Sequence, residues 1–207
     1  MNVETIPAGP AGTNCYMVHN GTDALIVDPG GEPEKLKTYL AEEGVEPQAI
    51  LLTHAHFDHI GAVEQLRMDF QIDVYLHADE NSWLEDPQLN GSALLLGREI
   101  VASPAEQNLV PGHMRIGSIP FEVVHTPGHS PGSVSFIFSD DKLVLGGDVL
   151  FNQGIGRTDL TGGDLEQLEQ TIRHSLYQLP DDYTVCPGHG PKTAIGEEKQ
   201  HNPFFPV

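Results

Sequence analysis

A stretch of seven residues, Thr53-His54-Ala55-His56-Phe57-Asp58-His59, constrains this chain most, because it contains four side chains that can bind a metal ion. Imidazole and carboxylate are ligands that zinc, iron and manganese accept in proteins, so no thiolate is required. The apolar run 49–53 predicts a buried strand, since it is short and lacks helical spacing. A single histidine after a strand would more often cap a helix. Four ligand-type side chains together predict a metal site at the end of that strand.

The spacing inside this stretch indicates how the ligands are arranged. In extended backbone, side chains two positions apart share a face, so His54, His56 and Asp58 are expected to converge. His59 then points elsewhere, and one ligand outside the row indicates a second metal ion. Apolar residues follow at helical spacing, namely Ile60, Val63, Leu66 and Phe70. They predict a helix that begins near Asp58, with the Asp58 carboxylate as its cap.

Size and composition indicate the class of protein. The chain has 207 residues, and we expect residues 1–207 to form one domain, since about 100 to 200 residues per domain are usual. Hydrophobic residues make up 39% and charged residues 19%, as in a folded globular protein. No apolar run approaches the length of about 18 residues that a membrane helix needs, and the N-terminus lacks the pattern of an export signal. We therefore expect a cytoplasmic protein without membrane contact.

The formal net charge of −20 bears on the binding partners. Two divalent cations would offset only a small part of it, so the surface is expected to be anionic. Such a surface repels phosphate backbones, which argues against nucleic acid as a partner. A small-molecule substrate is the expected partner, and the sequence leaves the oligomeric state open.

Other residues of ligand type are expected to have structural roles. Cys15 and Cys186 are far apart and lack C-x-x-C spacing, so we expect two buried thiols. His77 ends a predicted strand, where a single histidine is more often a hydrogen-bonded structural residue. His125 shares its strand face with apolar residues, which is typical of the edge of a core.

Carboxylates and histidines recur after the other predicted strands. Asp28 closes a strand before P-G-G, where its alternative role is to cap the turn. His129 lies in T-P-G-H-S-P-G, Asp148 follows L-V-L-G-G, and His189 lies in P-G-H-G-P. Strands outnumber helices, and these ligands all follow strands. The pattern predicts a layered α/β fold with the ligands gathered at strand ends.

This set of motifs resembles the signature of the metallo-β-lactamase superfamily. The motifs occur in the order that the superfamily has, over nearly the whole chain, and the small glyoxalase II-like hydrolases (hydroxyacylglutathione hydrolases) are most similar. The resemblance implies an αββα sandwich of two mixed β-sheets with outer helices and a metal cleft along one edge.

The resemblance also implies a ligand set for two divalent metal ions, with zinc expected and iron or manganese as alternatives. One ion takes His54, His56 and His129, the other takes Asp58, His59 and His189, and Asp148 bridges them. Asp58 is in addition a candidate catalytic residue, which orients the water between the ions or accepts its proton. Asp28 is expected behind the site, outside the ligand set.

The implied activity is hydrolysis of small acyl thioesters by a hydroxide that bridges the two ions. A thiol with a pKa near 8.5 leaves as a thiolate with little help from an acid, so no further catalytic group is needed. Asp148 argues against antibiotic hydrolysis, because the lactamases of the superfamily generally carry Cys or Ser there. They are also exported.

Departures from the glyoxalase II pattern limit the expected substrates. The segment G-R-T-D keeps only the basic residue of that pattern, Arg157, which would either hold a substrate carboxylate or form a salt bridge within its loop. An aromatic residue expected after His189 is replaced by Gly190-Pro191. The helical domain that holds glutathione in these enzymes is not recognised after the last predicted strand. Glutathione specificity is therefore not expected.

Two other functions remain open at this point. The segment G-R-T-D-L resembles persulfide dioxygenases more closely than glyoxalase II. In that family one iron is held by two histidines and a carboxylate, here His54, His129 and Asp148, an arrangement suited to oxygen chemistry. Against it, His189 completes a dinuclear set. The other alternative is a metal- or thiol-binding protein without catalytic activity, although an open dinuclear site seldom serves storage.

Overall fold

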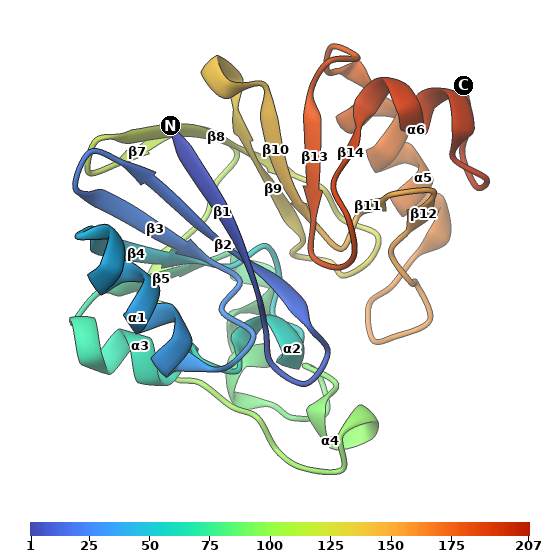
Figure 1. The fold of residues 1–207 in the computed structure, drawn as a ribbon. Coiled ribbons are helices and arrows are strands. Elements are labelled where there is room, and N and C mark those ends of the chain that lie inside the picture. The colour runs from blue at the N-terminus through green and yellow to red at the C-terminus, as the bar shows by residue number, and fades with distance from the viewer.

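The computed structural model describes all residues, 1–207, and contains two β-sheets packed face to face. Helices α1 (Pro33–Glu43) and α3 (Val63–Phe70) cover the outside of one sheet (Figure 1). Helices α5 (Leu165–His174) and α6 (Ile195–His201) cover the outside of the other (Figure 1). These four layers confirm the predicted αββα sandwich of two mixed sheets.

The first sheet has the strand order β1-β2-β3-β4-β5-β6. Its strands are β1 (Asn2–Ala8), β2 (Thr13–Asn20), β3 (Asp23–Val27), β4 (Glu46–Leu51), β5 (Asp73–Leu76) and β6 (Gln107–Asn108). Strands β1 to β3 are antiparallel, whereas β3 to β6 run parallel. Strands β2 and β3 form a hairpin in which Asn20 pairs with Asp23, and Gly21 in the two-residue turn between them has a positive φ of 61°, which glycine adopts readily.

The second sheet has the strand order β14-β13-β10-β9-β8-β7. Its strands are β7 (Gly112–Ile116), β8 (Ile119–His125), β9 (Val134–Phe138), β10 (Leu143–Gly147), β13 (Thr184–Pro187) and β14 (Thr193–Ala194). Only β10 and β13 are parallel neighbours. A separate small hairpin consists of β11 (Leu150–Phe151) and β12 (Gly154–Ile155).

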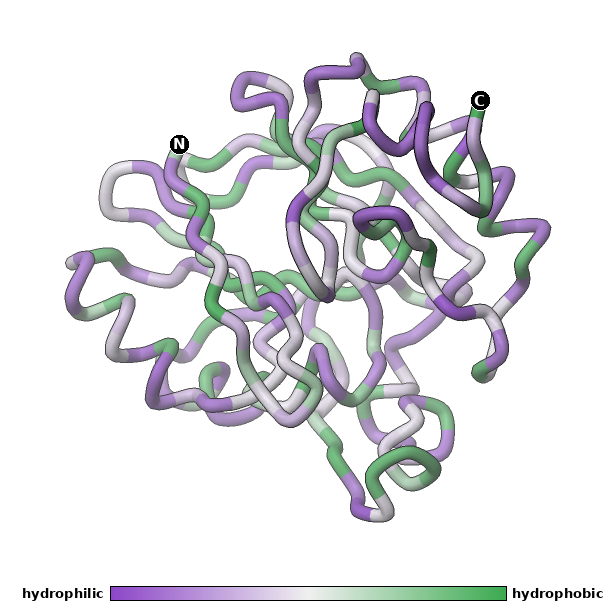
Figure 2. Tube along the Cα trace, turned by 45° about the vertical axis from the view of Figure 1, so that its right-hand side comes forward, coloured by the Kyte–Doolittle hydropathy of each residue, from purple (hydrophilic) through white to green (hydrophobic).

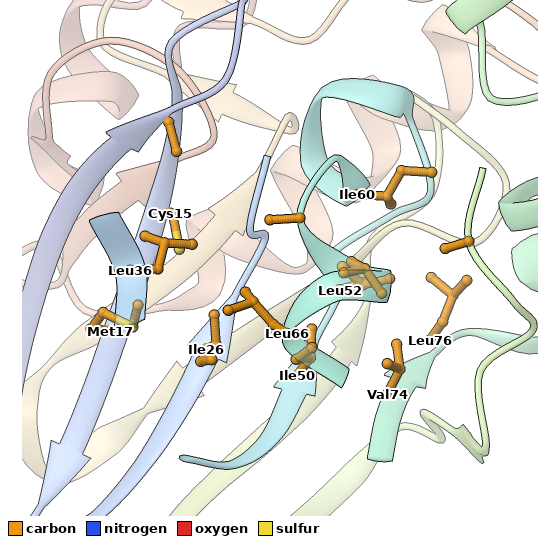
Figure 3. Close-up of a cluster of buried hydrophobic side chains, with 14 of the residues drawn as sticks. Cys15, Met17, Ile26, Leu36, Ile50, Leu52, Ile60, Leu66, Val74 and Leu76 are labelled. Atoms are coloured by element: carbon orange, nitrogen blue, oxygen red, sulfur yellow. The ribbon is translucent and has the colours of Figure 1, made fainter. Parts of the chain in front are cut away.

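Apolar side chains fill the spaces between the layers. Because side chains alternate along a strand, Tyr16 of β2 packs in the core between the sheets, whereas Cys15 and Met17 face the helices. Figure 3 shows this outer core, in which Leu36 of α1 and Leu66 of α3 lie over the first sheet. Cys15 and Cys186 are both buried and unpaired, as predicted.

Helix α1 shows how local sequence sets the bounds of an element. Pro33 stands in the first turn, where its missing N–H costs nothing, and Leu36 and Leu40 are buried at helical spacing. Gly44 ends the helix with a φ of 65°, the left-handed conformation that glycine adopts readily. These local signals account for the bounds of the helix, 33–43.

Parallel strands bring the predicted ligands to one edge of the sandwich. Asp28 follows β3, and His54 lies shortly after its parallel neighbour β4. On the second sheet, Asp148 follows β10 and His189 lies shortly after the parallel strand β13. Since parallel strands end on the same side of a sheet, both pairs of residues lie at strand ends that share an edge.

The helix that follows the H-x-H-x-D-H motif differs from the prediction. It is broken at Gly61 into α2 (Phe57–Ile60) and α3, and its N-cap is His56 in extended conformation. The cap predicted at Asp58 is wrong, because this carboxylate is already inside α2 and lies 2.9 Å from Nε2 of His189. The Asp58 carboxylate thus contacts a side chain that is distant in sequence instead of capping the helix.

Several smaller elements were not expected from the sequence. After β5 the chain forms the 3-10 helix η1 (Ala78–Glu85) and then the short helix α4 (Ser92–Leu95). Two further 3-10 helices are η2 (Ser139–Asp141) and η3 (Leu176–Gln178). Leu165, in the first turn of α5, is 54% exposed. None of the helices has the length and apolar character needed to span a membrane.

Candidate metal centre

Asp28 organises the backbone at the start of the ligand stretch. It has a positive φ of 51°, and its two carboxylate oxygens accept hydrogen bonds from the amide (2.7 Å) and hydroxyl (2.6 Å) of Thr53. The same Thr53 hydroxyl lies 3.0 Å from Nδ1 of His54. On its other side, Oδ2 of Asp28 is 3.0 Å from Nδ1 of His59. This buried carboxylate thus stands behind two of the predicted ligands, His54 and His59.

Three histidines form the first ligand group. Nε2 of His129 lies 2.9 Å from Nδ1 of His56 and 3.3 Å from Nε2 of His54. Nδ1 of His129 donates a hydrogen bond to the carbonyl of Arg157 at 2.7 Å, which leaves Nε2 with a free lone pair toward the group. Metal–nitrogen bonds of about 2.0–2.1 Å in a tetrahedron place nitrogen atoms about 3.3 Å apart. The three histidines therefore fit the coordination of one ion.

Asp58, His59 and His189 form the second ligand group. Oδ2 of Asp58 lies 2.9 Å from Nε2 of His189 and 3.8 Å from Nε2 of His59. Because Nδ1 of His59 faces Asp28, its Nε2 is directed into the group. The prediction that His59 points away from its neighbours is wrong in this respect: its ring centre lies only 4.1 Å from that of His54. The side chain of His59 therefore lies within the cluster of ligand residues.

Asp148 lies between the two groups. Its Oδ1 is 3.5 Å from Nε2 of His59, and its Oδ2 is 3.7 Å from Nε2 of both His129 and His189. Oδ1 of Asp148 and Nε2 of His59 are buried and have no hydrogen-bond partner. Buried polar atoms normally have partners, so a carboxylate oxygen and an imidazole nitrogen that face each other without one fit a cation between them. A Cβ at Gly188 would stand 2.1 Å from Oδ1 of Asp148, which explains the glycine.

The pKa values of the cluster separate into two classes. Burial, together with the neighbouring imidazoles, lowers the pKa of His54 well below its ordinary value and that of His56 to about 3. Burial also disfavours the charged form of His59, but Asp28 and Asp148 outweigh it and raise its pKa. For Asp58, burial is outweighed by His59 and His189, which hold its pKa below the usual range. The first group is thus kept as neutral imidazole, the form that binds metal ions.

A pocket of about 470 Å³ opens over the cluster. Ligand residues form its floor, and apolar side chains form its walls, namely Phe57, Leu95, Phe151, Ile155 and Leu160. Leu94 and Leu95 of α4 are 71% and 44% exposed, and α4 is a hydrophobic stretch at the lower edge of Figure 2. A larger hollow of about 700 Å³ between β1 and α1 contains none of the predicted site residues.

Arg157 is the only lysine or arginine that lines this pocket. Its Nε and one terminal nitrogen donate to the two oxygens of Asp159 at 2.7 and 2.8 Å, while both side chains remain exposed. Of the two roles expected for Arg157, the structure shows the salt bridge within the loop.

His77 has the hydrogen bond that was predicted for it, and His125, predicted at the edge of the core, is hydrogen-bonded as well. Nδ1 of His77 accepts a hydrogen bond from the amide of Asp79 at the start of η1, and Nε2 of His125 donates to the carbonyl of Pro131 at 2.8 Å. Their rings stack with centres 4.5 Å apart. With Asp79 they form a further group of ligand-type residues, which shares no member with the main cluster.

All seven predicted ligands converge, and two contributors to the site were missed. Thr53, adjacent to the motif, joins Asp28 to His54, and its position beside the ligands was the only signal. Glu80 of η1 accepts hydrogen bonds from the backbone of both loops that carry the first ligand group. Nothing in the local pattern around Glu80 marks it as buried.

Comparison with known proteins places the chain in a family. The model of the metallo-beta-lactamase superfamily matches residues 8–189. The "Probable metallo-hydrolase YqgX" of Bacillus subtilis is 48% identical over 99% of this chain and 98% of its own length. The hydroxyacylglutathione hydrolase GloC of Haemophilus influenzae is 37% identical, again over 99% of this chain and 98% of its own.

Solved structures extend the comparison. The BLEG-1 B3 metallo-beta-lactamase is 51% identical, with a TM-score of 0.95 over 98% of this chain and 99% of that one. TTHA1623 in a di-iron-bound form is 41% identical, with a TM-score of 0.89 over 98% and 100%. ETHE1 from Myxococcus xanthus is 28% identical, with a TM-score of 0.81 over 98% and 84%. The sandwich, the converging ligands and these matches lead to one conclusion: the chain belongs to the metallo-beta-lactamase superfamily of metal-dependent hydrolases.

Proposed function

We propose that this chain is a dinuclear metal-dependent hydrolase of small acyl thioesters. The observation that carries the proposal is the position of Asp148, whose carboxylate faces both ligand groups: Oδ1 lies 3.5 Å from His59 of the second group, and Oδ2 lies 3.7 Å from His129 of the first. A carboxylate shared in this way suits two ions close together. The name of the Haemophilus influenzae relative, a hydroxyacylglutathione hydrolase, supports a thioester as substrate.

Each ligand group would hold one ion. His54, His56 and His129 would hold the first, Asp58, His59 and His189 the second, and Asp148 would be shared. When bound, the two ions supply Lewis acidity for the substrate carbonyl and activate a water. Zinc is the expected metal, and the di-iron form of TTHA1623 supports iron as the alternative.

The residues of the chain would orient the reactants. Asp58 stays in its carboxylate form because its pKa is held below the usual range, and Thr13 donates to its Oδ2 at 3.2 Å. It can therefore accept a hydrogen bond from the attacking water and direct the lone pair of that water toward the carbonyl carbon. The apolar walls over the cluster would exclude bulk water and contact the acyl chain.

The lining of the pocket favours a leaving group that needs no proton. Apart from the ligand set, the lining residues are apolar except for Arg157, which is too weak an acid to protonate an amine. A thiolate leaves without protonation, because the pKa of a thiol is about 8.5. The net charge of −20 further supports a small molecule rather than nucleic acid as the partner.

Two other activities have specific support. The 51% identity with the BLEG-1 B3 metallo-beta-lactamase favours β-lactam hydrolysis as a candidate. The expectation that Asp148 argues against this activity therefore stays a prediction. The likeness to ETHE1 from Myxococcus xanthus stands beside the G-R-T-D-L segment, on which the persulfide dioxygenase alternative rests.

One set of assays separates the three activities. The purified protein is loaded with zinc or, without oxygen, with ferrous iron. Each form is then given acyl and 2-hydroxyacyl thioesters, a chromogenic cephalosporin, and a persulfide with oxygen. We expect thiol release from the thioesters to have the highest kcat/KM. Stoichiometric oxygen consumption with persulfide, or cephalosporin cleavage, in a protein that cleaves no thioester would overturn the proposal.

A further inference from the structure

Glu80 connects the two loops that carry the first ligand group. Its side chain is fully buried in η1, Oε2 accepts from the amide of Ala55 at 2.6 Å, and Oε1 accepts from the amide of Gly132 at 2.7 Å. Ala55 stands between His54 and His56, after a strand of the first sheet. Gly132 belongs to the loop of His129, between two strands of the second sheet. One carboxylate thus joins loops from both sheets.

Glu80 lies close to the backbone of both loops. A Cβ at Gly132 would stand 2.9 Å from Cγ of Glu80, so only glycine lets this backbone approach. No lysine, arginine or histidine forms an ion pair with Glu80, and its two closest partners are backbone amides. Burying a carboxylate without a cationic partner is costly, so the two amide bonds must be well formed for the group to be tolerated here.

The second ligand group has supports of its own. Asp28, which reaches His54 only through Thr53, contacts His59 directly, and the loop of His189 is held by Tyr16 and Asn14 of β2. The Tyr16 hydroxyl donates to the carbonyl of Pro187 at 2.7 Å, and Nδ2 of Asn14 donates to the carbonyls of Pro187 and Gly190 at 3.0 and 2.9 Å. None of these groups contacts Glu80.

We propose that Glu80 is a positioning residue that sets the affinity of the first metal ion only. It fixes the distance between the His54–His56 backbone and the His129 loop, so that three imidazole nitrogens meet at one point. This inference rests on the proposed dinuclear site. Outer contacts of this kind typically change metal affinity by about 10- to 100-fold when they are removed.

Glu80→Gln is the variant that tests the role. It keeps the shape of the side chain but replaces one oxygen by an NH₂ group, which cannot accept from the facing backbone amide. We expect the affinity of the first ion, at the three histidines, to fall by about 10- to 100-fold. The affinity of the second ion should change by less than about threefold. The measurement is a titration of apo-protein with zinc against a competing chelator, followed by the absorption spectrum of the cobalt form.

Glu198→Gln is the matched control. Glu198 of α6 is also buried, with 1% exposure, and accepts from the amide of Gln153, the hydroxyl of Thr193 and Nδ2 of Asn202. It contacts neither ligand loop. We expect this variant to lower the midpoint of thermal unfolding while both metal affinities remain those of the wild type.

Three outcomes overturn the role of Glu80. These are unchanged affinities in folded Glu80→Gln, an equal loss of both affinities, and the same selective loss in Glu198→Gln. If Glu80→Gln does not fold, Glu80→Asp is used, because the shorter carboxylate cannot reach both amides and should give the same selective loss. Binding of only one ion to the wild type would contradict the dinuclear proposal instead, and the two failures are thereby distinguished.

Discussion

Oδ2 of Asp28 lies 3.0 Å from Nδ1 of His59, and this contact directs the other ring nitrogen of His59 toward Asp58 and Asp148. The contact joins the end of β3 to the helix that follows β4. It therefore couples a residue with a strained backbone, φ 51°, to the orientation of a predicted ligand.

The variant Asp28→Asn tests this coupling. Asparagine tolerates positive φ, so the backbone conformation is kept while the negative charge behind His59 is lost. We expect the affinity of the ion at Asp58, His59 and His189 to fall by about 10-fold or more. A metal titration of the purified variant measures this, and affinities equal to those of the wild type would contradict the assigned orientation.

Asp148 should be needed for both ions. Removing it in Asp148→Ala leaves the two ligand groups without the carboxylate that faces both. We expect elemental analysis to give close to two ions per chain in the wild type and fewer in the variant, with thioester hydrolysis abolished. Asp182→Ala, an exposed residue paired with Lys142, is the control and should keep both properties. A wild type that binds one ion under metal excess would refute the dinuclear site.

Acid should destabilise the apo-protein through His56, whose pKa is lowered to about 3 by burial and by His129. Below pH 6.5 the unfolded chain binds a proton at this residue and the folded chain does not, so stability falls with pH down to about 3. At pH 5 the loss amounts to about 2 kcal/mol. We therefore expect His56→Ala to gain about this much relative to wild type between pH 7 and 5, in urea unfolding with chelator present. Parallel pH profiles would contradict the assignment.

The ion pair of Arg157 with Asp159 should influence substrate choice. Because Asp159 occupies the guanidinium, a substrate carboxylate gains little from this cation. We expect Asp159→Asn to raise kcat/KM for a thioester with a terminal carboxylate by about fivefold relative to a neutral one of equal length, as exposed charge pairs contribute at most about 1 kcal/mol. Equal changes for both substrates would show that Arg157 does not face the bound acyl group.

Salt should stabilise the fold, because the chain has a net charge of −20. Raising the ionic strength from low values to 0.15 M shortens the Debye length to about 8 Å and weakens repulsion among exposed carboxylates. We expect the midpoint of thermal unfolding to rise with sodium chloride in this range. A midpoint that stays constant or falls would count against self-repulsion as a significant destabilising contribution.

The convergence of the ligands could be predicted because it follows from local rules. Each ligand stands after an apolar strand, and parallel strands end on the same side of a sheet, as β10 and β13 do before Asp148 and His189. Equally local residues, Pro33 and Gly44, set the bounds of α1. These signals lie within a few residues of the feature that they predict.

Features that depend on distant partners could not be predicted. Asp58 has the residue type of a helix cap, but its carboxylate faces His189 from the far end of the chain. Leu165 follows the cap residue Asp164, and the inward face of α5 begins only at Leu168. The sequence around Glu80 is typical of an exposed segment. Glu80 is buried because the Gly132 backbone, which is distant in sequence, packs against it.

The two ligand groups draw on both sheets, since His54 to His59 follow β4 of the first sheet, whereas Asp148 and His189 follow strands of the second. An ion that needs ligands from both can be bound only while the sheets are docked. In the proposed dinuclear site, metal occupancy and the docking of the two sheets would therefore be linked, because each ion would join ligands from both sheets across the open edge. Metal scarcity would then shorten the lifetime of the folded chain against proteases as well as stop its chemistry, so that idle molecules are cleared first.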